Sequence, residues 1–185
     1  KVTNTGAVLA GTVIEAGNQD DGTVVAGTVT ASATLTASDV DANATQTWSL
    51  QGTPSTTYGA MSIDPSTGVW TYTLDNTLAA TQALKEGQTV TQTYVARVTD
   101  DKDAYVDQTI VVTINGTNDV PVVANLATAL AGTVVEAGNQ DNGTAVAGTV
   151  SVSGTLSATD VDANATQTWS LQGTPSTTYG AMSIN

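Results

Sequence analysis

Carboxylate side chains are the groups of this sequence best suited to chemistry, and they gather in four short segments. These segments span residues 15–21, 39–43, 100–103 and 118–119. The chain contains no histidine and no cysteine, so it lacks the usual general base and the ligands of zinc–thiolate sites. Carboxylate and amide oxygens remain, and these are the ligands that Ca²⁺ prefers. The residue types therefore favour calcium binding over acid–base or nucleophilic catalysis.

The overall charge excludes several classes of partner. Four basic residues against 17 acidic residues give a net charge of −13. Such a chain repels phosphate backbones, so we expect no nucleic-acid partner. No apolar run is long enough to cross a bilayer, so we expect no membrane insertion. The hydrophobic fraction of 40% is sufficient for a folded core.

The sequence repeats itself with a period of 121 residues. The segment that begins at Gly132 copies the segment that begins at Gly11, and the two differ at nine of 54 aligned positions. The second copy reaches Asn185, which aligns with Asp64. We therefore expect residues 1–119 to form a complete repeat and residues 120–185 to form the truncated N-terminal half of the next one. Such a half would expose the inner faces of its strands, and the parent protein would be a long tandem array.

Apolar and hydroxyl side chains alternate with a period of two, which is typical of half-buried antiparallel strands. Trp70, Tyr72 and Leu74, for example, alternate with two threonines. The expected strands are 7–15, 27–38, 46–52, 58–64, 69–75, 90–99 and 106–115. Only residues 77–86 fit a helical turn, which Gly87 would end. Seven short strands in about 110 residues predict an all-β fold, an immunoglobulin-like antiparallel β-sandwich, with successive repeats joined end to end.

Alternating strand directions would sort the acidic segments to two ends of the sandwich. Glu15 and the segment 118–119 fall at one end, and the segments 39–43 and 100–103 fall at the other. In a tandem array, Glu15 and Asp119 of one copy would then face residues 160–164 of the next copy. Opposed carboxylates repel each other, and Ca²⁺ would hold them together.

Several motifs together resemble a known repeat family. They are Val13-Ile-Glu-Ala-Gly17, Asp39-Val-Asp41, Asp64-Pro-Ser-Thr-Gly-Val-Trp-Thr-Tyr-Thr-Leu-Asp-Asn76 and Ile114-Asn-Gly-Thr-Asn-Asp-Val-Pro121. This set is similar to the VCBS-type, cadherin-like repeats of giant bacterial adhesins. Those adhesins are of the RTX and biofilm-associated kinds and are exported by type I secretion. The resemblance covers one whole repeat and half of the next.

The resemblance implies a structural role. In that family the repeats are extenders that hold a ligand-binding tip away from the cell, and Ca²⁺ stiffens their joints. The chain would thus be extracellular, on a bacterial cell surface, with neighbouring identical repeats as partners and with any host or surface ligand bound by other domains. The implied calcium ligands are Glu15, Asp39, Asp41, Asp100, Asp103, Asn118 and Asp119, with Glu136, Asp160 and Asp162 in the second copy.

The sequence also fits other interpretations. Residues 39–43 begin like an EF-hand loop, but Ala44 and Leu50 stand where that loop needs Gly and Glu. The segment is therefore either another kind of calcium cluster or a solvated turn held by Asx hydrogen bonds. An Ig-like adhesion module that itself binds a carbohydrate or a protein is the alternative function. Enzymatic activity is not expected, because a repeat this compact has no insertion that could form a cleft.

Overall fold

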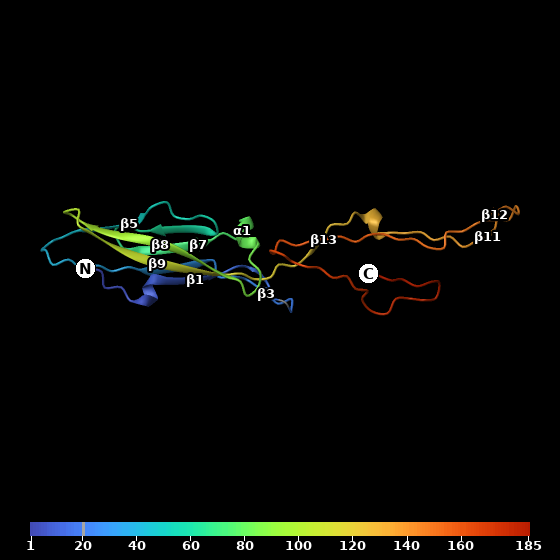
Figure 1. Ribbon diagram of the computed structural model, residues 1–185, viewed down its shortest axis with the longest axis horizontal. Helices are drawn as coiled ribbons and strands as arrows, with labels where there is room; N and C mark the ends of the chain where they lie inside the picture. Colours follow the sequence, from blue (N-terminus) through green and yellow to red (C-terminus); the bar gives the residue numbers. More distant parts are fainter. Residues whose placement is uncertain (20) are drawn as a thin grey trace. The chain divides into compact units, whose positions relative to one another are not determined.

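Two packed β-sheets form the first part of the chain (Figure 1). The computed structural model describes residues 1–19 and 21–185, which divide into two units. The first unit comprises residues 1–120 and 161–163, and the second comprises residues 121–160 and 164–185. The elements of the first unit are η1 (Gly6–Leu9), β1 (Ala10–Ile14), β2 (Gly17–Asn18), β3 (Val24–Val25), β4 (Thr30–Thr34), β5 (Gln46–Gln51), β6 (Gly59–Ile63), β7 (Val69–Leu74), α1 (Ala79–Gln82), β8 (Thr89–Asp100) and β9 (Tyr105–Asn115).

The sheet order brings the first and last strands of this unit together. One sheet has the order β1-β9-β8-β5, and the other has the order β4-β7-β6. Pairing within these sheets is antiparallel except between β1 and β9, which are parallel. Ile14 at the end of β1 also exchanges two backbone hydrogen bonds with Thr28, of 2.9 and 2.8 Å. The arrangement is an immunoglobulin-like β-sandwich, and the predicted fold class is confirmed.

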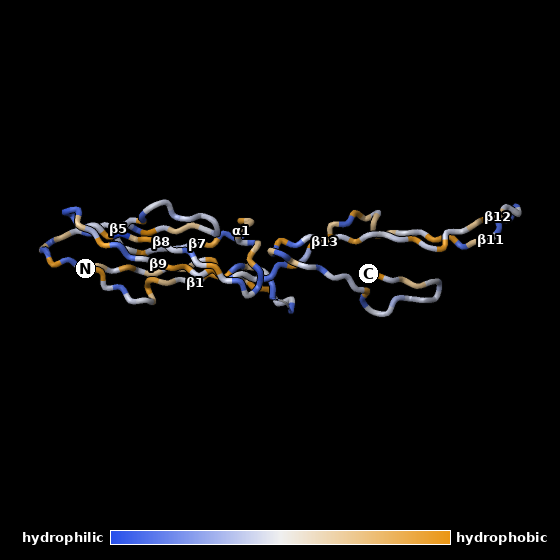
Figure 2. Tube along the Cα trace, in the orientation of Figure 1, coloured by the Kyte–Doolittle hydropathy of each residue, from blue (hydrophilic) through white to orange (hydrophobic). Residues whose placement is uncertain are grey.

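Inward-facing side chains from both sheets make one hydrophobic core. On β7, Trp70 and Tyr72 have no exposed surface, and on β9 residues 110, 112 and 114 have none either. The residues between them carry mainly hydroxyl groups and face outward. Figure 2 shows this alternation as short apolar and polar stretches along neighbouring strands. The period of two in the sequence therefore decides which side chains fill the core.

The predicted elements agree with the structure except near α1 and between β1 and β4. Each expected strand of the first repeat is present, with ends that shift by at most four residues. The prediction that Gly87 ends the helical turn is wrong, because α1 ends at Gln82 and Ala83 is its C-cap. Gly87 instead has φ +77° in the turn before β8, where the Gln88 amide donates to the Lys85 carbonyl. The hairpin of β2 and β3 was not predicted.

Asp64 shapes the tight turn between β6 and β7. Its Oδ1 accepts hydrogen bonds from the amides of Ser66 (2.9 Å) and Thr67 (2.8 Å). These bonds, with those of the two side-chain hydroxyls, favour the carboxylate and lower the pKa of Asp64 to about 2. Gly68 closes the turn with φ +70°, and a Cβ there would lie 2.7 Å from the Leu35 carbonyl oxygen. Glycine is thus required in this turn.

A buried polar network connects β8 with the loop between β5 and β6. The Oε1 atom of Gln92 accepts hydrogen bonds from the hydroxyls of Tyr72 (2.9 Å) and Tyr94 (2.7 Å). The Nε2 atom of Gln92 donates to the Ser55 hydroxyl at 2.8 Å. Gln92 is 8% exposed, so the loss of a partner here is not compensated fully by water.

We expect Tyr94→Phe to lower the free energy of unfolding by about 1 kcal/mol, because the hydroxyl that donates to Gln92 Oε1 (2.7 Å) and to the Ser55 carbonyl (3.2 Å) is lost while the ring stays in place. Urea denaturation measures the change. The matched control is Tyr105→Phe, since Tyr105 is 58% exposed, and it should leave stability unchanged. Equal stability of Tyr94→Phe and the unsubstituted protein would contradict this account of the network.

The second unit has few strands and exposes apolar side chains. Its elements are β10 (Val122–Val123), η2 (Ala127–Leu130), β11 (Gly138–Asn139), β12 (Ala145–Val146) and β13 (Ala158–Thr159). The local contacts repeat those of the first copy, since Asn125 Oδ1 accepts from the Ser157 amide as Asn4 Oδ1 does from Thr36. Met182 is 73% exposed, whereas its copy Met61 is 8% exposed. Residues 65–119, which cover Met61 in the first copy, have no second copy in the sequence.

Candidate metal centre

Glu15 directly follows β1, and its side chain lies in the protein interior. Val13 and Glu15 share the inward face because side chains alternate along an extended chain, and neither has any exposed surface. The Glu15 amide donates to the Asn115 carbonyl at 3.0 Å, which keeps the chain beside β9. The Glu15 carboxylate accepts hydrogen bonds from Gln82 Nε2 (3.3 Å) and from the Thr117 amide (3.2 Å). A fully buried carboxylate is thus held by donors that carry no charge.

The segment after β9 is fixed next to Glu15. Thr117 is 7% exposed, and its hydroxyl donates to the Glu15 carbonyl at 3.4 Å. Asn118 and Asn18 exchange two backbone hydrogen bonds of 2.6 and 3.0 Å. These contacts position Asp119, which follows directly, at the same end of the sandwich.

Residues 161–163 bring a third carboxylate to this end of the first unit. Asp162 is 7% exposed, and its Oδ2 accepts a hydrogen bond from the Asp119 amide at 2.8 Å. The Ala163 amide donates to the Ala83 carbonyl, just beyond α1, at 3.2 Å. Glu15, Asp119 and Asp162 are called the acidic cluster below. The structure therefore brings together residues from both copies of the repeat.

The surroundings of Glu15 change its affinity for protons. Burial raises the pKa of Glu15 from 4.5 to about 7; the Thr117 amide opposes this shift, and the negative charges of Asp119 and Asp162 add to it. In the described ranges 1–19 and 21–185, no lysine or arginine forms an ion pair with Glu15. The carboxyl group is thus close to half ionised near neutral pH, and a cation bound beside it would favour the charged form.

Carboxylate groups are a kind of ligand that Ca²⁺ accepts, and calcium binding at the acidic cluster stays a prediction. Ca²⁺ takes six to eight oxygen ligands from carboxylates, amide or backbone carbonyls and waters, and the cluster offers three carboxyl groups that carry like charge. In the part of the chain that the structure describes, no group of three or more acidic side chains is arranged so that it could hold a metal ion without other ligands. Carbonyl oxygens or waters would have to supply the remaining ligands, as they do in many calcium sites.

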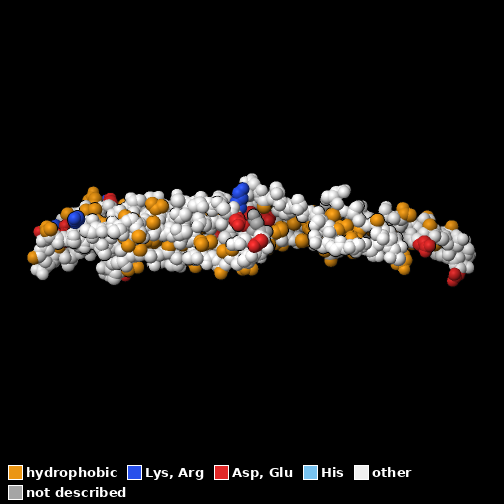
Figure 3. All heavy atoms as spheres, turned by 90° about the horizontal axis from the view of Figure 1, so that it is seen from below, with side chains coloured by type: hydrophobic (Ala, Val, Ile, Leu, Met, Phe, Trp, Pro, Cys, Tyr) orange, Lys and Arg blue, Asp and Glu red, His pale blue; other side chains and the backbone are white. Residues whose placement is uncertain are grey.

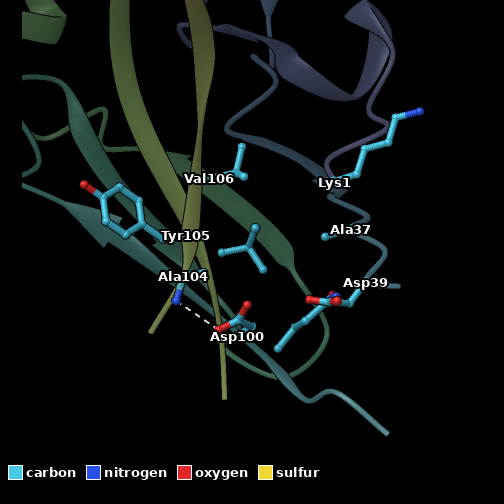
Figure 4. Close-up of a pocket in the computed structure, with 9 residues that line it drawn as sticks. Lys1, Ala37, Asp39, Asp100, Ala104, Tyr105 and Val106 are labelled. Carbon is cyan, nitrogen blue, oxygen red and sulfur yellow. Dashed lines mark hydrogen bonds between the residues drawn. The ribbon is translucent and has the colours of Figure 1, made fainter. Parts of the chain in front are cut away.

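At the opposite end of the first unit, Asp39 and Asp100 line one surface pocket (Figure 4). Asp39 Oδ1 accepts a hydrogen bond from the Asp41 amide at 3.0 Å. Asp100 Oδ1 accepts from the amides of Lys102 (2.8 Å) and Ala104 (2.9 Å). Both carboxylates shape their own loops, as the Asx-turn alternative requires. Their role as calcium ligands stays a prediction.

The other predicted ligands are not part of the acidic cluster. Asp41 and Asp103 are exposed, and Asp103 has φ +65° in the turn before β9. Glu136 is exposed in the second unit, unlike its copy Glu15, and Asp160 is half-buried there. Asp20 lies outside the described residues. On the face that Figure 3 shows, most of the surface is uncharged, and the charged side chains gather at a few places.

The sequence did not reveal the neutral donors of the site. Gln82 and Thr117 hold the Glu15 carboxylate from positions 67 and 102 residues away along the chain. Asn76 also lies near this end, and its Oδ1 accepts a hydrogen bond from the Ala16 amide at 3.3 Å. The sequence around Thr117 gives no sign of its contact with Glu15.

A scan against protein-family models gives no match for this chain, and a search among curated proteins gives none either. The likeness to VCBS-type, cadherin-like repeats therefore stays a prediction from the motifs. In the described residues, no helix combines the length and the apolar character that crossing a membrane requires.

Proposed function

We propose that this chain is a structural extender of a secreted bacterial cell-surface adhesin, and that Ca²⁺ at the repeat ends stiffens the joints. The observation that supports the proposal most is the burial of Asp162, from the second copy, beside Glu15 and Asp119 of the first. Asp162 is the copy of Asp41. In a tandem array, the same loop of each copy would therefore meet the linker end of the copy before it.

In this proposal, Ca²⁺ acts by offsetting the repulsion between carboxylates. Three carboxylates at one joint repel each other in their charged forms, so the metal-free joint would open easily. Ca²⁺ would replace that repulsion with shared coordination and would favour the closed joint. Extracellular sites of this kind bind with a Kd of about 10⁻⁴–10⁻³ M, which suits a protein that is exported unfolded and folds outside the cell.

The biological setting in this proposal comes from the motif resemblance. It includes RTX or biofilm-associated adhesins, type I secretion and cell adhesion through other domains of the same protein. The chain itself would have no catalytic role, and its direct partners would be neighbouring identical repeats. Its contribution to adhesion would be length and stiffness.

Small-angle X-ray scattering tests this function. We expect the chain to give a longer and less variable particle in Ca²⁺ than in EGTA, because the closed joint restricts bending. Asp162→Asn should remove most of this difference. The matched control Asp41→Asn changes the same loop in the other copy, where the residue is exposed, and should keep it. Identical scattering in Ca²⁺ and EGTA would contradict the proposal.

A further inference from the structure

The two ends of residues 1–120 lie at opposite ends of the first unit. Lys1 lines the surface pocket that also contains Asp39 and Asp100, whereas Asn118 pairs with Asn18 at the end that holds Glu15. Between these ends runs β9, whose 11 residues span about 35 Å. Tension applied to residues 1 and 120 therefore acts along the strands.

The strands nearest to these two points are direct neighbours. β1 pairs in parallel with β9 from Ala10 opposite Val111 to Ile14 opposite Asn115. Backbone bonds continue the contact beyond β1, from Glu15 to Asn115 and between Asn18 and Asn118. Because the Glu15 amide bonds to the Asn115 carbonyl, the two-residue alternation of strands turns the backbone groups of residues 111 and 113 toward β1 as well.

We infer that the β1–β9 pair is a force-bearing clamp that lets the first unit carry tension along its length without unfolding. The inference extends the proposed stalk function, but the clamp itself needs no calcium. Pulling at the two ends would slide β1 and β9 in opposite directions. The backbone hydrogen bonds between the two strands then share the load, and they must break together. Sliding by one residue would also turn the buried Val13 away from Ile114 and Val112, all of which have 0% exposure.

A different pulling direction would remove this load sharing. Lys102 lies in the turn between β8 and β9, at the same end of the unit as Lys1. Force between residues 1 and 102 would peel the N-terminal segment and then β1 away from β9 one residue pair at a time. Forced unfolding is governed by the unfolding barrier, and the barrier is lower when bonds break in succession.

Single-molecule force spectroscopy tests the clamp on the full chain. The sequence contains no cysteine, so handles can be attached to Lys1→Cys with Val120→Cys, or to Lys1→Cys with Lys102→Cys. Val120 is 57% exposed, and the Lys102 side chain is 79% exposed, so both pairs should keep the native stability in urea. Measurements in EGTA keep any calcium effect at the joint out of the comparison.

We expect the mean unfolding force to be several-fold higher for the 1–120 pair than for the 1–102 pair. Equal forces, or a lower force for the 1–120 pair, would overturn the inference. The calcium proposal fails separately, since it predicts a difference between Ca²⁺ and EGTA and the clamp predicts a difference between pulling directions in EGTA alone.

Discussion

In the absence of calcium, the first unit should lose about 2–3 kcal/mol of its free energy of unfolding between pH 5 and pH 8. Glu15 causes this loss because its pKa is about 7 in the folded protein, compared with 4.5 for an unperturbed glutamate. The folded state therefore holds a proton on Glu15 more tightly than the unfolded state does. The stabilisation is complete below pH 4.5 and disappears as the pH rises through 7.

The window from pH 5 to pH 8 separates this effect from that of three carboxylates whose pKa is lowered in the folded protein. Asp64, Asp75 and Asp107 have lowered pKa values because of their hydrogen-bond partners, so they lose stabilising interactions only at more acidic pH. Asp119 and Asp162 face Glu15 and contribute to its shift. Urea denaturation in EGTA across this window gives the pH profile directly.

The repeat supplies a matched control for this experiment. Glu15→Gln removes the titrating group while its shape is kept, so most of the stability loss between pH 5 and pH 8 should disappear. Glu136→Gln makes the same change at the equivalent position of the second copy, where the side chain is exposed, and the profile should stay as in the unsubstituted protein. A Glu15→Gln variant with the original pH profile would show that Glu15 does not titrate as described.

Calcium should stabilise the same unit near neutral pH. At ten- to a hundred-fold over Kd, a site present only in the folded state adds about 1.4–2.7 kcal/mol. For a unit of this size, we expect the Tm to rise by about 5–10 °C when several millimolar Ca²⁺ replaces EGTA. Differential scanning calorimetry at pH 7.5 measures this shift.

The calcium effect should depend on the acidic cluster and on which divalent cation is added. Glu15→Gln should lose most of the rise in Tm, whereas Glu136→Gln should keep it. Mg²⁺ at the same concentration should give a smaller rise, because it dehydrates reluctantly and requires stricter octahedral geometry. A rise of equal size in Glu15→Gln would place the stabilising calcium elsewhere in the chain.

The strand pattern was predictable because each strand buries one face. Trp70 and Tyr72 alternate with threonines, and this spacing fixes both the strand type and the buried side chains. The pattern does not show which strands pair with each other, so it could not predict the parallel pairing of β1 with β9. The hairpin of β2 and β3 was missed because two-residue strands are too short to show a period.

The candidate site was predictable in part for a similar reason. Strand direction alone sorts Glu15 and Asp119 to one end, and the 121-residue repeat suggests which loop of the next copy should face them. The donors to the Glu15 carboxylate were not predictable, since Gln82 and Thr117 are distant along the chain. Nor did the sequence indicate the pKa of Glu15, because that value depends on how completely the fold buries the side chain.

Proton release on calcium binding tests the central claim most directly. If Ca²⁺ binds beside Glu15, whose pKa is about 7, binding at pH 7 should release about half a proton, because the metal requires the ionised carboxylate. Isothermal titration calorimetry in two buffers of different ionisation enthalpy measures this number.

The predicted result is a binding enthalpy that depends on the buffer in the unsubstituted chain and in Glu136→Gln, and that does not depend on it in Glu15→Gln. A titration without binding heat in either buffer, or the same buffer dependence in Glu15→Gln, would contradict the account of the acidic cluster as a calcium-binding joint.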